Sequence, residues 1–218
     1  MARIHEKLER AVASESEVGA PERQPDHGSP DGGTPDGPVG RVIVNPVSGE
    51  RIVVRQSGRD TEGRLFEFDL FLPPGGHVPA GHAHPTQQER FTVIAGSMRF
   101  RLGRRTILAA PGDSVAIPPR TSHWFGNAGS SVAHARVEVR PALRMEEFFE
   151  ATEEIGRAGH IPGTRLPRVS DLARVMLEYR REVAAPYVPA LVFRALLAPF
   201  AWFGNRRARR QAADEPDR

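Results

Sequence analysis

The sequence predicts an all-β, jelly-roll type of barrel that carries an N-terminal arm and a C-terminal α-helical extension. Residues 40–141 consist of short runs in which apolar and polar side chains alternate, as they do along strands that bury one face. Glycines and prolines separate these runs, and no helical periodicity occurs between them. Many short strands without interleaved helices are typical of antiparallel sandwiches and barrels.

The composition limits the kinds of protein that this chain can be. Its 218 residues suit one domain with appendages, or at most two small domains. It contains no cysteine, which excludes disulfide frameworks and thiolate metal sites, so any metal must be held by histidine, carboxylate or water. The formal net charge is +3, and the basic residues, all arginine except Lys7, are mostly dispersed. We therefore expect no nucleic-acid partner.

Residues 1–39 are predicted to form a disordered arm. Most of this segment is proline, glycine and polar residues, which cannot bury enough apolar surface to offset the entropy lost on ordering. The first residues show neither an apolar run nor a small-residue cleavage site, so no secretory signal is recognised and a cytoplasmic location is expected.

Nine strands are predicted between residues 40 and 141. In the third of them, Phe66, Phe68, Leu70 and Leu72 fall on one face, which should point into the core. The predicted strands cover residues 41–44, 51–56, 64–72, 89–95, 97–103, 105–110, 114–118, 123–127 and 132–140.

Helical periodicity begins after Pro141, and residues 142–205 are predicted to form the helical extension. Helices are expected over 143–155 and over 170–183, the second with Ser170 as its N-cap. Residues 184–203 are strongly apolar, interrupted by prolines and by one arginine. This segment could pack on the barrel or on a partner subunit, which we favour, lie on a membrane surface, or span a membrane. Residues 206–218 are predicted to be a basic and polar tail.

Two histidines and a glutamate lie close together in the segment GHAHPTQQE. His82 and His84 are two residues apart and point to one side of an extended chain, and Glu89 follows at the start of the next strand. His123 begins a later strand that can lie beside this pair in an antiparallel barrel. Three imidazoles and one carboxylate leave two positions of an octahedral ion open, as in sites that perform chemistry. The four residues are therefore predicted to bind a divalent transition metal.

The spacing of these residues resembles the two sequence motifs of the cupins. Within this resemblance, which covers about residues 40–141, His82, His84, Glu89 and His123 would be the metal ligands in the mouth of a small conical jelly roll. The first motif is matched by Gly76-x5-His82-x-His84-x4-Glu89-x6-Gly96, and the second by Gly112-x5-Pro118-x-Arg120-x2-His123-x3-Asn127.

One position departs from the second motif, which usually has glycine where this chain has Arg120. Glycine at such a turn serves a left-handed backbone angle, so arginine implies either a different turn or a modest strain. Its side chain is expected to be exposed, or else to grip an anionic substrate at the rim. Asn127 is expected to close a turn, His77 to lie at the surface or behind the site, and His134 to be exposed.

The residues in phase with the ligands should form the walls of the pocket. Phe91 and Val93 alternate with Glu89, and Phe125 alternates with His123. These apolar walls around a cationic floor favour a small, largely apolar substrate with a metal-binding pair of oxygens. The alternative is that the rings simply fill the core.

The ligand set predicts a metal-dependent, dioxygenase-like oxidoreductase, because cupins with these ligands resemble dioxygenases and oxalate-handling enzymes. The ion would be Fe, Mn or Ni, with Zn also possible, and Glu89 could act as a catalytic base. A metal-dependent isomerase or decarboxylase, and a cupin that only binds or senses a small ligand, remain alternatives. The expected partner is a small-molecule substrate, and the helical extension could also build a homodimer.

Overall fold

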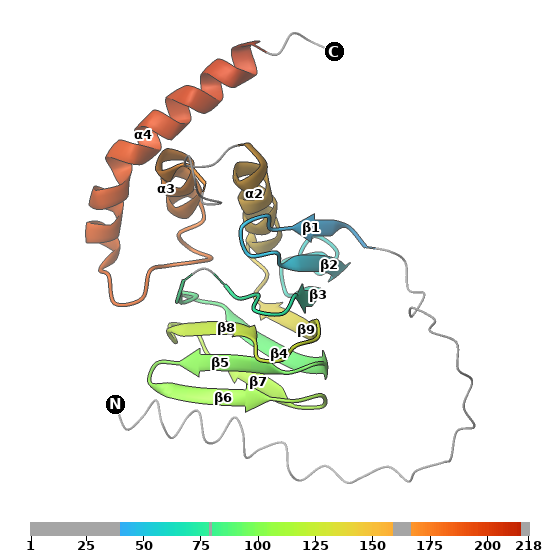
Figure 1. The fold of residues 1–218 in the computed structure, drawn as a ribbon. Coiled ribbons are helices and arrows are strands. Elements are labelled where there is room, and N and C mark those ends of the chain that lie inside the picture. Colours follow the sequence, from blue (N-terminus) through green and yellow to red (C-terminus); the bar gives the residue numbers. More distant parts are fainter. Residues whose placement is uncertain (1–39, 79, 159–166, 215–218) are drawn as a thin grey trace, which may run out of the picture. The chain divides into compact units, whose positions relative to one another are not determined.

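A computed structural model describes residues 40–78, 80–158 and 167–214. Within these residues the chain forms nine strands followed by three helices. Figure 1 shows how these elements are arranged. The arm predicted for residues 1–39 lies outside the described residues. The strands are β1 (Val42–Val44), β2 (Arg51–Gln56), β3 (Phe66–Leu72), β4 (Gln88–Ala95), β5 (Met98–Leu102), β6 (Arg105–Ala109), β7 (Ser114–Ile117), β8 (His123–Asn127) and β9 (Ala133–Arg140). All nine predicted strands are thus confirmed within a few residues.

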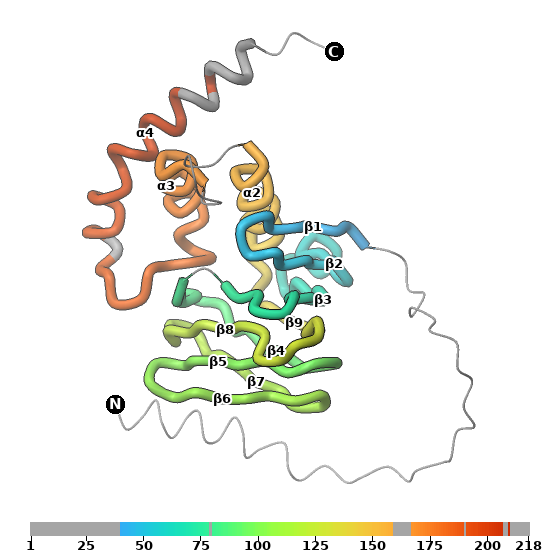
Figure 2. Tube along the Cα trace, in the orientation of Figure 1, coloured from blue at the N-terminus to red at the C-terminus, as the bar shows by residue number. Residues whose placement is uncertain are grey.

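The strands form two antiparallel sheets that pack face to face. The larger sheet has the order β1-β2-β3-β9-β4-β7, and the smaller one has the order β6-β5-β8. The Phe91 ring of β4 lies 5.1 Å from the Phe100 ring of β5 and 4.8 Å from the Phe125 ring of β8, so the space between the sheets is filled. This arrangement confirms the predicted all-β jelly-roll class, and Figure 2 traces the path of the chain through it.

Alternation along the strands creates the core. Phe66, Phe68, Leu70 and Leu72 of β3 are all buried, as the period of two predicted. Facing positions of the neighbouring strand β9 are equally apolar, with Val137 opposite Phe68. Burial of each large apolar side chain stabilises the fold by about 2 kcal/mol. Because a shift of one residue would turn these side chains of β3 to the other face, their burial also sets the register of the larger sheet.

Between β3 and β4, which both belong to the larger sheet, a crossing segment of the chain runs along the edge of the smaller sheet. His77 bridges to Gly126 and His82 bridges to His123, so this segment runs beside β8. A Cβ atom at Gly126 would lie 2.8 Å from the Cβ of His77, so glycine is needed for this close approach.

The three helices are α2 (Met145–Ala158), α3 (Val169–Glu178) and α4 (Ala190–Asp214). The Phe149 ring of α2 lies 5.4 Å from Phe68, so α2 covers part of the inner face of β3. Ile155 of α2 forms a small core with Val175 and Tyr179, which joins α2 to α3. The N-cap prediction is wrong, because α3 begins at Val169 and its cap residue makes no side-chain capping bond. No helix in the described part of the chain has the length and apolar character that a membrane span needs.

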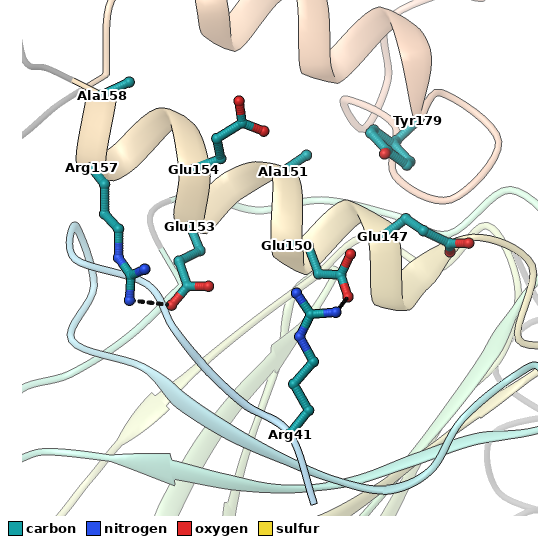
Figure 3. Close-up of a pocket in the computed structure, with 9 residues that line it drawn as sticks. All are labelled: Arg41, Glu147, Glu150, Ala151, Glu153, Glu154, Arg157, Ala158 and Tyr179. Carbon is teal, nitrogen blue, oxygen red and sulfur yellow. Dashed lines mark hydrogen bonds and ion pairs between the residues drawn. The ribbon is translucent and has the colours of Figure 1, made fainter. Parts of the chain in front are cut away.

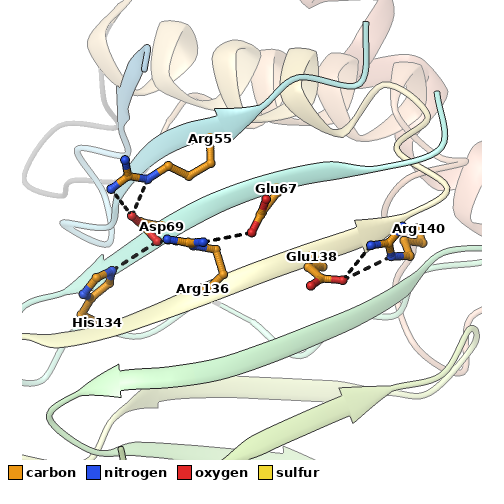
Figure 4. Close-up of polar contacts among 7 residues, drawn as sticks. All are labelled: Arg55, Glu67, Asp69, His134, Arg136, Glu138 and Arg140. Carbon is orange, nitrogen blue, oxygen red and sulfur yellow. Dashed lines mark hydrogen bonds and ion pairs between the residues drawn. The ribbon is translucent and has the colours of Figure 1, made fainter. Parts of the chain in front are cut away.

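A buried carboxylate organises the opposite face of the larger sheet (Figure 4). Asp69 of β3 has no exposed surface and receives hydrogen bonds from Nε of Arg55 and Nε of Arg136, each at 2.6 Å. His134 lies 3.3 Å from the same carboxylate and stacks on Phe71, with 4.3 Å between ring centroids. The prediction that His134 is exposed is therefore wrong, because cross-strand neighbours cover it.

Candidate metal site

The two histidine-bearing segments are joined directly by backbone hydrogen bonds. The N–H of His82 donates to the carbonyl of His123 at 2.9 Å, and the N–H of His123 donates back at 2.8 Å. Three residues before His123, the N–H of Arg120 donates to the carbonyl of His84 at 2.7 Å. The histidine pair and His123 are thus fixed side by side on paired backbone segments, although His123 follows His84 by 39 positions in the sequence.

Glu89 reaches the same point from the larger sheet. It is the second residue of β4, and it pairs with Ile117 on one side and Val139 on the other, so its side chain points inward in phase with Phe91. The carboxylate oxygen Oε2 lies 3.2 Å from Nε2 of His84 and 3.1 Å from Nε2 of His123. The structure therefore brings together all four residues that the sequence predicted as ligands, with one donor atom of each within 4.8 Å of the others.

Backbone carbonyls determine the direction in which each imidazole presents its lone pair. Nδ1 of His84 lies 2.6 Å from the carbonyl of Glu182, Nδ1 of His123 2.9 Å from that of Thr121, and Nδ1 of His82 3.3 Å from that of Ala80. Because a carbonyl only accepts, the ring proton belongs on Nδ1 in each case, and Nε2 carries the free lone pair. Carbonyl partners of this kind orient metal-binding histidines in proteins.

This arrangement fits a cation better than it fits a metal-free core. Nε2 of His84, Nε2 of His123 and Oε2 of Glu89 are buried and have no hydrogen-bond partner among the described residues. Two nitrogen lone pairs thus face a carboxylate oxygen, which is unfavourable unless a proton or a metal ion lies between them. Three imidazole nitrogens and one carboxylate oxygen suit Fe, Mn, Ni or Zn.

The electrostatics of the cluster agree with a site built for positive charge. Burial opposes ionisation of Glu89, but His84 and His123 together hold the pKa of its carboxyl well below the ordinary value. Burial likewise opposes a charge on His84, yet the Glu89 carboxylate raises the pKa of this imidazole. Burial, and then the neighbouring His123 and His84, lower the pKa of His82 to about 3, which keeps it neutral and ready to bind a metal.

The helical extension contributes to the site through its backbone. The segment after α3 supplies the Glu182 carbonyl that holds His84, and Ala184 exchanges two backbone hydrogen bonds with Ala83, at 2.9 and 3.1 Å. Sequence reasoning missed this contact, because a backbone carbonyl nearly a hundred residues away leaves no signal in the pattern of side chains.

Replacing Ala184 by proline should weaken metal binding without touching a ligand. Proline removes the N–H that donates to Ala83, so the segment that orients His84 loses its anchor. Loss of such an orienting contact costs about 10–100-fold in metal affinity. Titration with Ni²⁺ or Mn²⁺ monitored by calorimetry measures the effect, with Tyr187→Ala on the exposed part of the same connection as the control. Unchanged affinity in Ala184→Pro would show that the extension does not support the site.

The residues predicted as pocket walls lie in the interior, and Phe125 is the one with a ring close to a candidate ligand. Phe91, Val93 and Phe125 are all buried, and the Phe125 ring lies 6.4 Å from the ring of His82. His82 is the most accessible of the four candidate ligands, so solvent reaches the cluster on its side. The packing of Phe91 against Phe125 shows that these rings also fill the core.

Glu50 is a further buried carboxyl that sequence reasoning missed. It lies just before β2, in phase with the inward-facing Ile52 and Val54, and that phase was the available signal. Glu50 is only 5% exposed. Among the described residues, its carboxylate has one side-chain partner, the Ser48 hydroxyl, at 3.4 Å. Burial raises the pKa of Glu50 to about 7, the Ser48 hydroxyl opposes the rise, and the negative charge of Glu89 adds to it.

The raised pKa of Glu50 predicts how stability depends on pH. Between pH 4.5 and about 7 the folded protein keeps a proton on Glu50 that the unfolded chain releases, so stability falls as the pH rises through this window. The side chain of Glu50→Gln stays neutral at every pH. Over this window the free energy of unfolding of the variant should therefore fall by about 3 kcal/mol less than that of the wild type.

Urea unfolding of the chelator-treated protein at pH 5 and pH 8 measures this difference. Glu62→Gln serves as the control, because Glu62 is exposed and its ion pair among the described residues is with the exposed Arg64. Parallel pH dependences for the wild type and Glu50→Gln would contradict the assignment.

The remaining motif residues have structural roles. Arg120 keeps a positive φ of 63°, so arginine retains the turn that glycine usually makes and carries a modest strain, while its side chain is exposed. Asn127 donates to the carbonyls of Leu72 and Ser131 and accepts from the N–H of Gly129, so it closes the turn after β8 as expected. His77 is exposed, lies beside Trp124, and does not belong to the cluster.

An acidic pocket of about 660 Å³ lies elsewhere, between α2 and Tyr179 (Figure 3). Its glutamates are partly neutralised, because Arg41 pairs with Glu150 and Arg157 pairs with Glu153. None of the four candidate ligands lines this pocket.

Comparison with known proteins supports the fold of the barrel. Residues 68–139 match the family model described as a cupin domain. No curated protein sequence matches the chain.

Three solved structures that resemble the chain do so over less than half of its length. KdgF from Halomonas sp. is 16% identical and aligns with 43% of this chain and 81% of its own, with a TM-score of 0.39. A predicted oxalate decarboxylase from Thermotoga maritima is 18% identical (48% and 94% covered, TM-score 0.42), and a sugar phosphate isomerase from Silicibacter pomeroyi is 22% identical (46% and 69% covered, TM-score 0.39). Likenesses of this strength carry no argument about activity.

Proposed function

The chain belongs to the cupin superfamily, and from that premise we propose that it is a metal-dependent oxidoreductase of the dioxygenase type. The observation that supports this most is the set of buried, unpartnered donor atoms on His84, His123 and Glu89, with His82 completing the set on the accessible side. On an octahedral Fe, Mn or Ni ion, three nitrogens and one oxygen would leave two positions for small oxygen ligands, whereas the same four ligands would close a tetrahedral Zn site.

A bound Fe, Mn or Ni ion would supply Lewis acidity and a route for electrons between dioxygen and the substrate. The residues of the chain would position the ion and the substrate and exclude water. The three imidazoles, fixed through Nδ1, define where an ion and a substrate oxygen would meet. Phe91 and Phe125 keep water away from the inner side of the cluster.

The substrate that suits this site is small, largely apolar and anionic at one end. A divalent ion and the Glu89 carboxylate leave a formal charge of +1, which attracts an enolate, a catecholate or a carboxylate. The residues proposed as walls, Phe91, Val93 and Phe125, offer aromatic and aliphatic side chains and no hydroxyl or amide group for a sugar.

We propose that two carboxyls share the proton transfers. Glu89 is the base expected from the sequence, but its low pKa makes it a weak proton acceptor while His84 and His123 surround it. Glu50 has a pKa of about 7, which suits a group that takes and returns a proton near neutral pH. Glu50 is buried in phase with the inward-facing Ile52 and Val54, and the negative charge of Glu89 adds to the rise of its pKa.

Oxygen consumption tests the proposal. The full chain, stripped with a chelator and reloaded with Fe²⁺, Mn²⁺ or Ni²⁺, would be offered a panel of enols, catechols and thiols. We expect oxygen uptake with at least one pair of metal and substrate, its loss in His123→Ala, and its retention in His77→Ala.

Two other outcomes would replace the proposal. Turnover of a panel compound without oxygen uptake would support an isomerase or a decarboxylase. Binding of a panel compound to the metal-loaded protein without any turnover would support a ligand-binding or sensing cupin.

A further inference from the structure

Helix α4 carries a large apolar surface that no described part of the chain covers. Leu191 is 77% exposed, Leu196 63% and Phe203 61%, and the other exposed apolar side chains lie beside them along the same helix. These are Val192, Phe200 and Trp202, with Tyr187 and Val188 just before the helix. Single exposed apolar residues are common, but a continuous group of this size marks an interaction surface.

The exposure follows from how α4 packs on α3. The side of α4 that is buried carries small residues, namely Ala201 and Gly204. A Cβ atom at Gly204 would lie 2.5 Å from the carbonyl oxygen of Ser170, so the two helices are in close backbone contact there. The small residues therefore face α3, and the large apolar residues face away from it.

The charge of this segment is entirely positive. No aspartate or glutamate occurs from Ala184 to Ala213, whereas Arg194 lies within the apolar half of α4 and four arginines follow between residues 206 and 210. The Arg206 guanidinium lies 4.7 Å from the centroid of the Trp202 ring. An aromatic side chain and a cation thus meet where the apolar part of α4 ends and its arginine cluster begins. Arg206 and Arg209 are exposed.

We propose that α4 docks the protein on an anionic lipid surface, with its apolar half in the interfacial region and its arginines against the headgroups. The exposed apolar residues occupy the first part of α4 and the arginine cluster follows them, so the helix offers an apolar segment to the lipid interface and a cationic segment to anionic headgroups, with no acidic residue between Ala184 and Ala213. A second copy of the chain is a poorer occupant, because each copy would bring Arg194 into the apolar contact with no acidic residue of the same segment to pair with it. This inference is independent of the reaction that the metal site performs.

Vesicle binding of the full chain tests the proposal. The protein contains two tryptophans, so Trp124→Phe leaves Trp202 as the only one and its emission as a direct probe of α4. Vesicles of phosphatidylcholine with phosphatidylglycerol should bind the protein and shift the Trp202 emission to shorter wavelength. Vesicles of phosphatidylcholine alone should bind it much more weakly, and added salt should weaken binding to the anionic vesicles.

Two sets of variants separate the apolar from the electrostatic contribution. Leu191→Ser with Leu196→Ser should reduce vesicle binding by roughly tenfold or more. Arg206→Gln with Arg209→Gln should reduce binding by about fivefold per arginine, on anionic vesicles only. Leu108→Ser, at a residue on β6 that is 67% exposed, is the matched control and should bind like the wild type.

Other results would overturn the proposal. One is an absence of vesicle binding by a folded full chain. Another is a protein that does not bind vesicles but forms a dimer in light scattering, and whose dimer dissociates in the double variant Leu191→Ser with Leu196→Ser. A second copy of the chain would then be the partner that covers the helix. Equal binding to neutral and anionic vesicles would remove the role given to the arginines.

Discussion

Replacing His123 by alanine is expected to lower the affinity for Fe²⁺, Mn²⁺ or Ni²⁺ by at least about 100-fold. Loss of a residue that merely orients a ligand already costs about 10–100-fold, and His123 would itself donate the nitrogen. It is also the side chain that brings the second motif to the cluster, with Nε2 at 3.1 Å from Glu89. Calorimetric titration of the chelator-treated full chain measures the loss, and Glu89→Gln, which keeps the volume of the side chain, should show it as well.

The matched control is His77→Ala. His77 precedes the cluster by five residues and belongs to the same crossing segment, yet it is exposed and lies beside Trp124 instead of the ligands. Its removal should leave metal affinity within about twofold, which is a small fraction of the loss expected for a ligand. Equal losses for His77→Ala and His123→Ala would mean that the histidines bind metal nonspecifically.

Replacing Asp69 by asparagine is expected to lower the free energy of unfolding by about 2–3 kcal/mol. The carboxylate is fully buried and holds two arginines and His134, so the change leaves cations without their partner. This loss is smaller than the roughly 3–5 kcal/mol typical of breaking a fully buried ion pair, because Arg55 and Arg136 remain partly exposed and water screens them. Urea unfolding at pH 7 measures the difference.

Glu138→Gln is the control for this variant, because Glu138 lies on the same sheet and pairs with Arg140 at the surface. Its loss should cost less than about 1 kcal/mol. Burial opposes the charge of Asp69, but its arginine and histidine partners lower the pKa of its carboxyl, so its contribution to stability is present above the ordinary pKa and is lost as the pH falls. A cost for Asp69→Asn no larger than that for Glu138→Gln would contradict the role given to this carboxylate.

The strands could be predicted because their signal is local. Phe66 to Leu72 alternate in the sequence, and the same residues alternate between core and opposite face in the structure. The four candidate ligands could be proposed for a similar reason, since two short motifs carry them and the barrel brings the motifs together through the pairing of His82 with His123.

The missed features depend on contacts between distant parts of the chain. The Glu182 carbonyl behind His84 comes from the helical extension, and no side-chain pattern encodes it. His134 does lie on the face opposite the core, as alternation predicts, but Phe71 and Asp69 on the neighbouring strand cover it. The N-cap at Ser170 would contribute about 1 kcal/mol. Gly204 of α4 packs closely against the backbone of Ser170, so a contact with a distant part of the chain involves the same first turn of α3.

The coordination of a bound ion tests the central claim most directly. X-ray absorption at the metal edge of the Ni²⁺-loaded or Mn²⁺-loaded full chain would count the imidazole rings around the ion. The four-residue cluster predicts one ion per chain with three imidazole nitrogens in its first shell, and with two in His123→Ala if the ion is retained at high concentration. A shell of oxygen atoms alone, or the same spectrum in wild type and His123→Ala, would contradict the account.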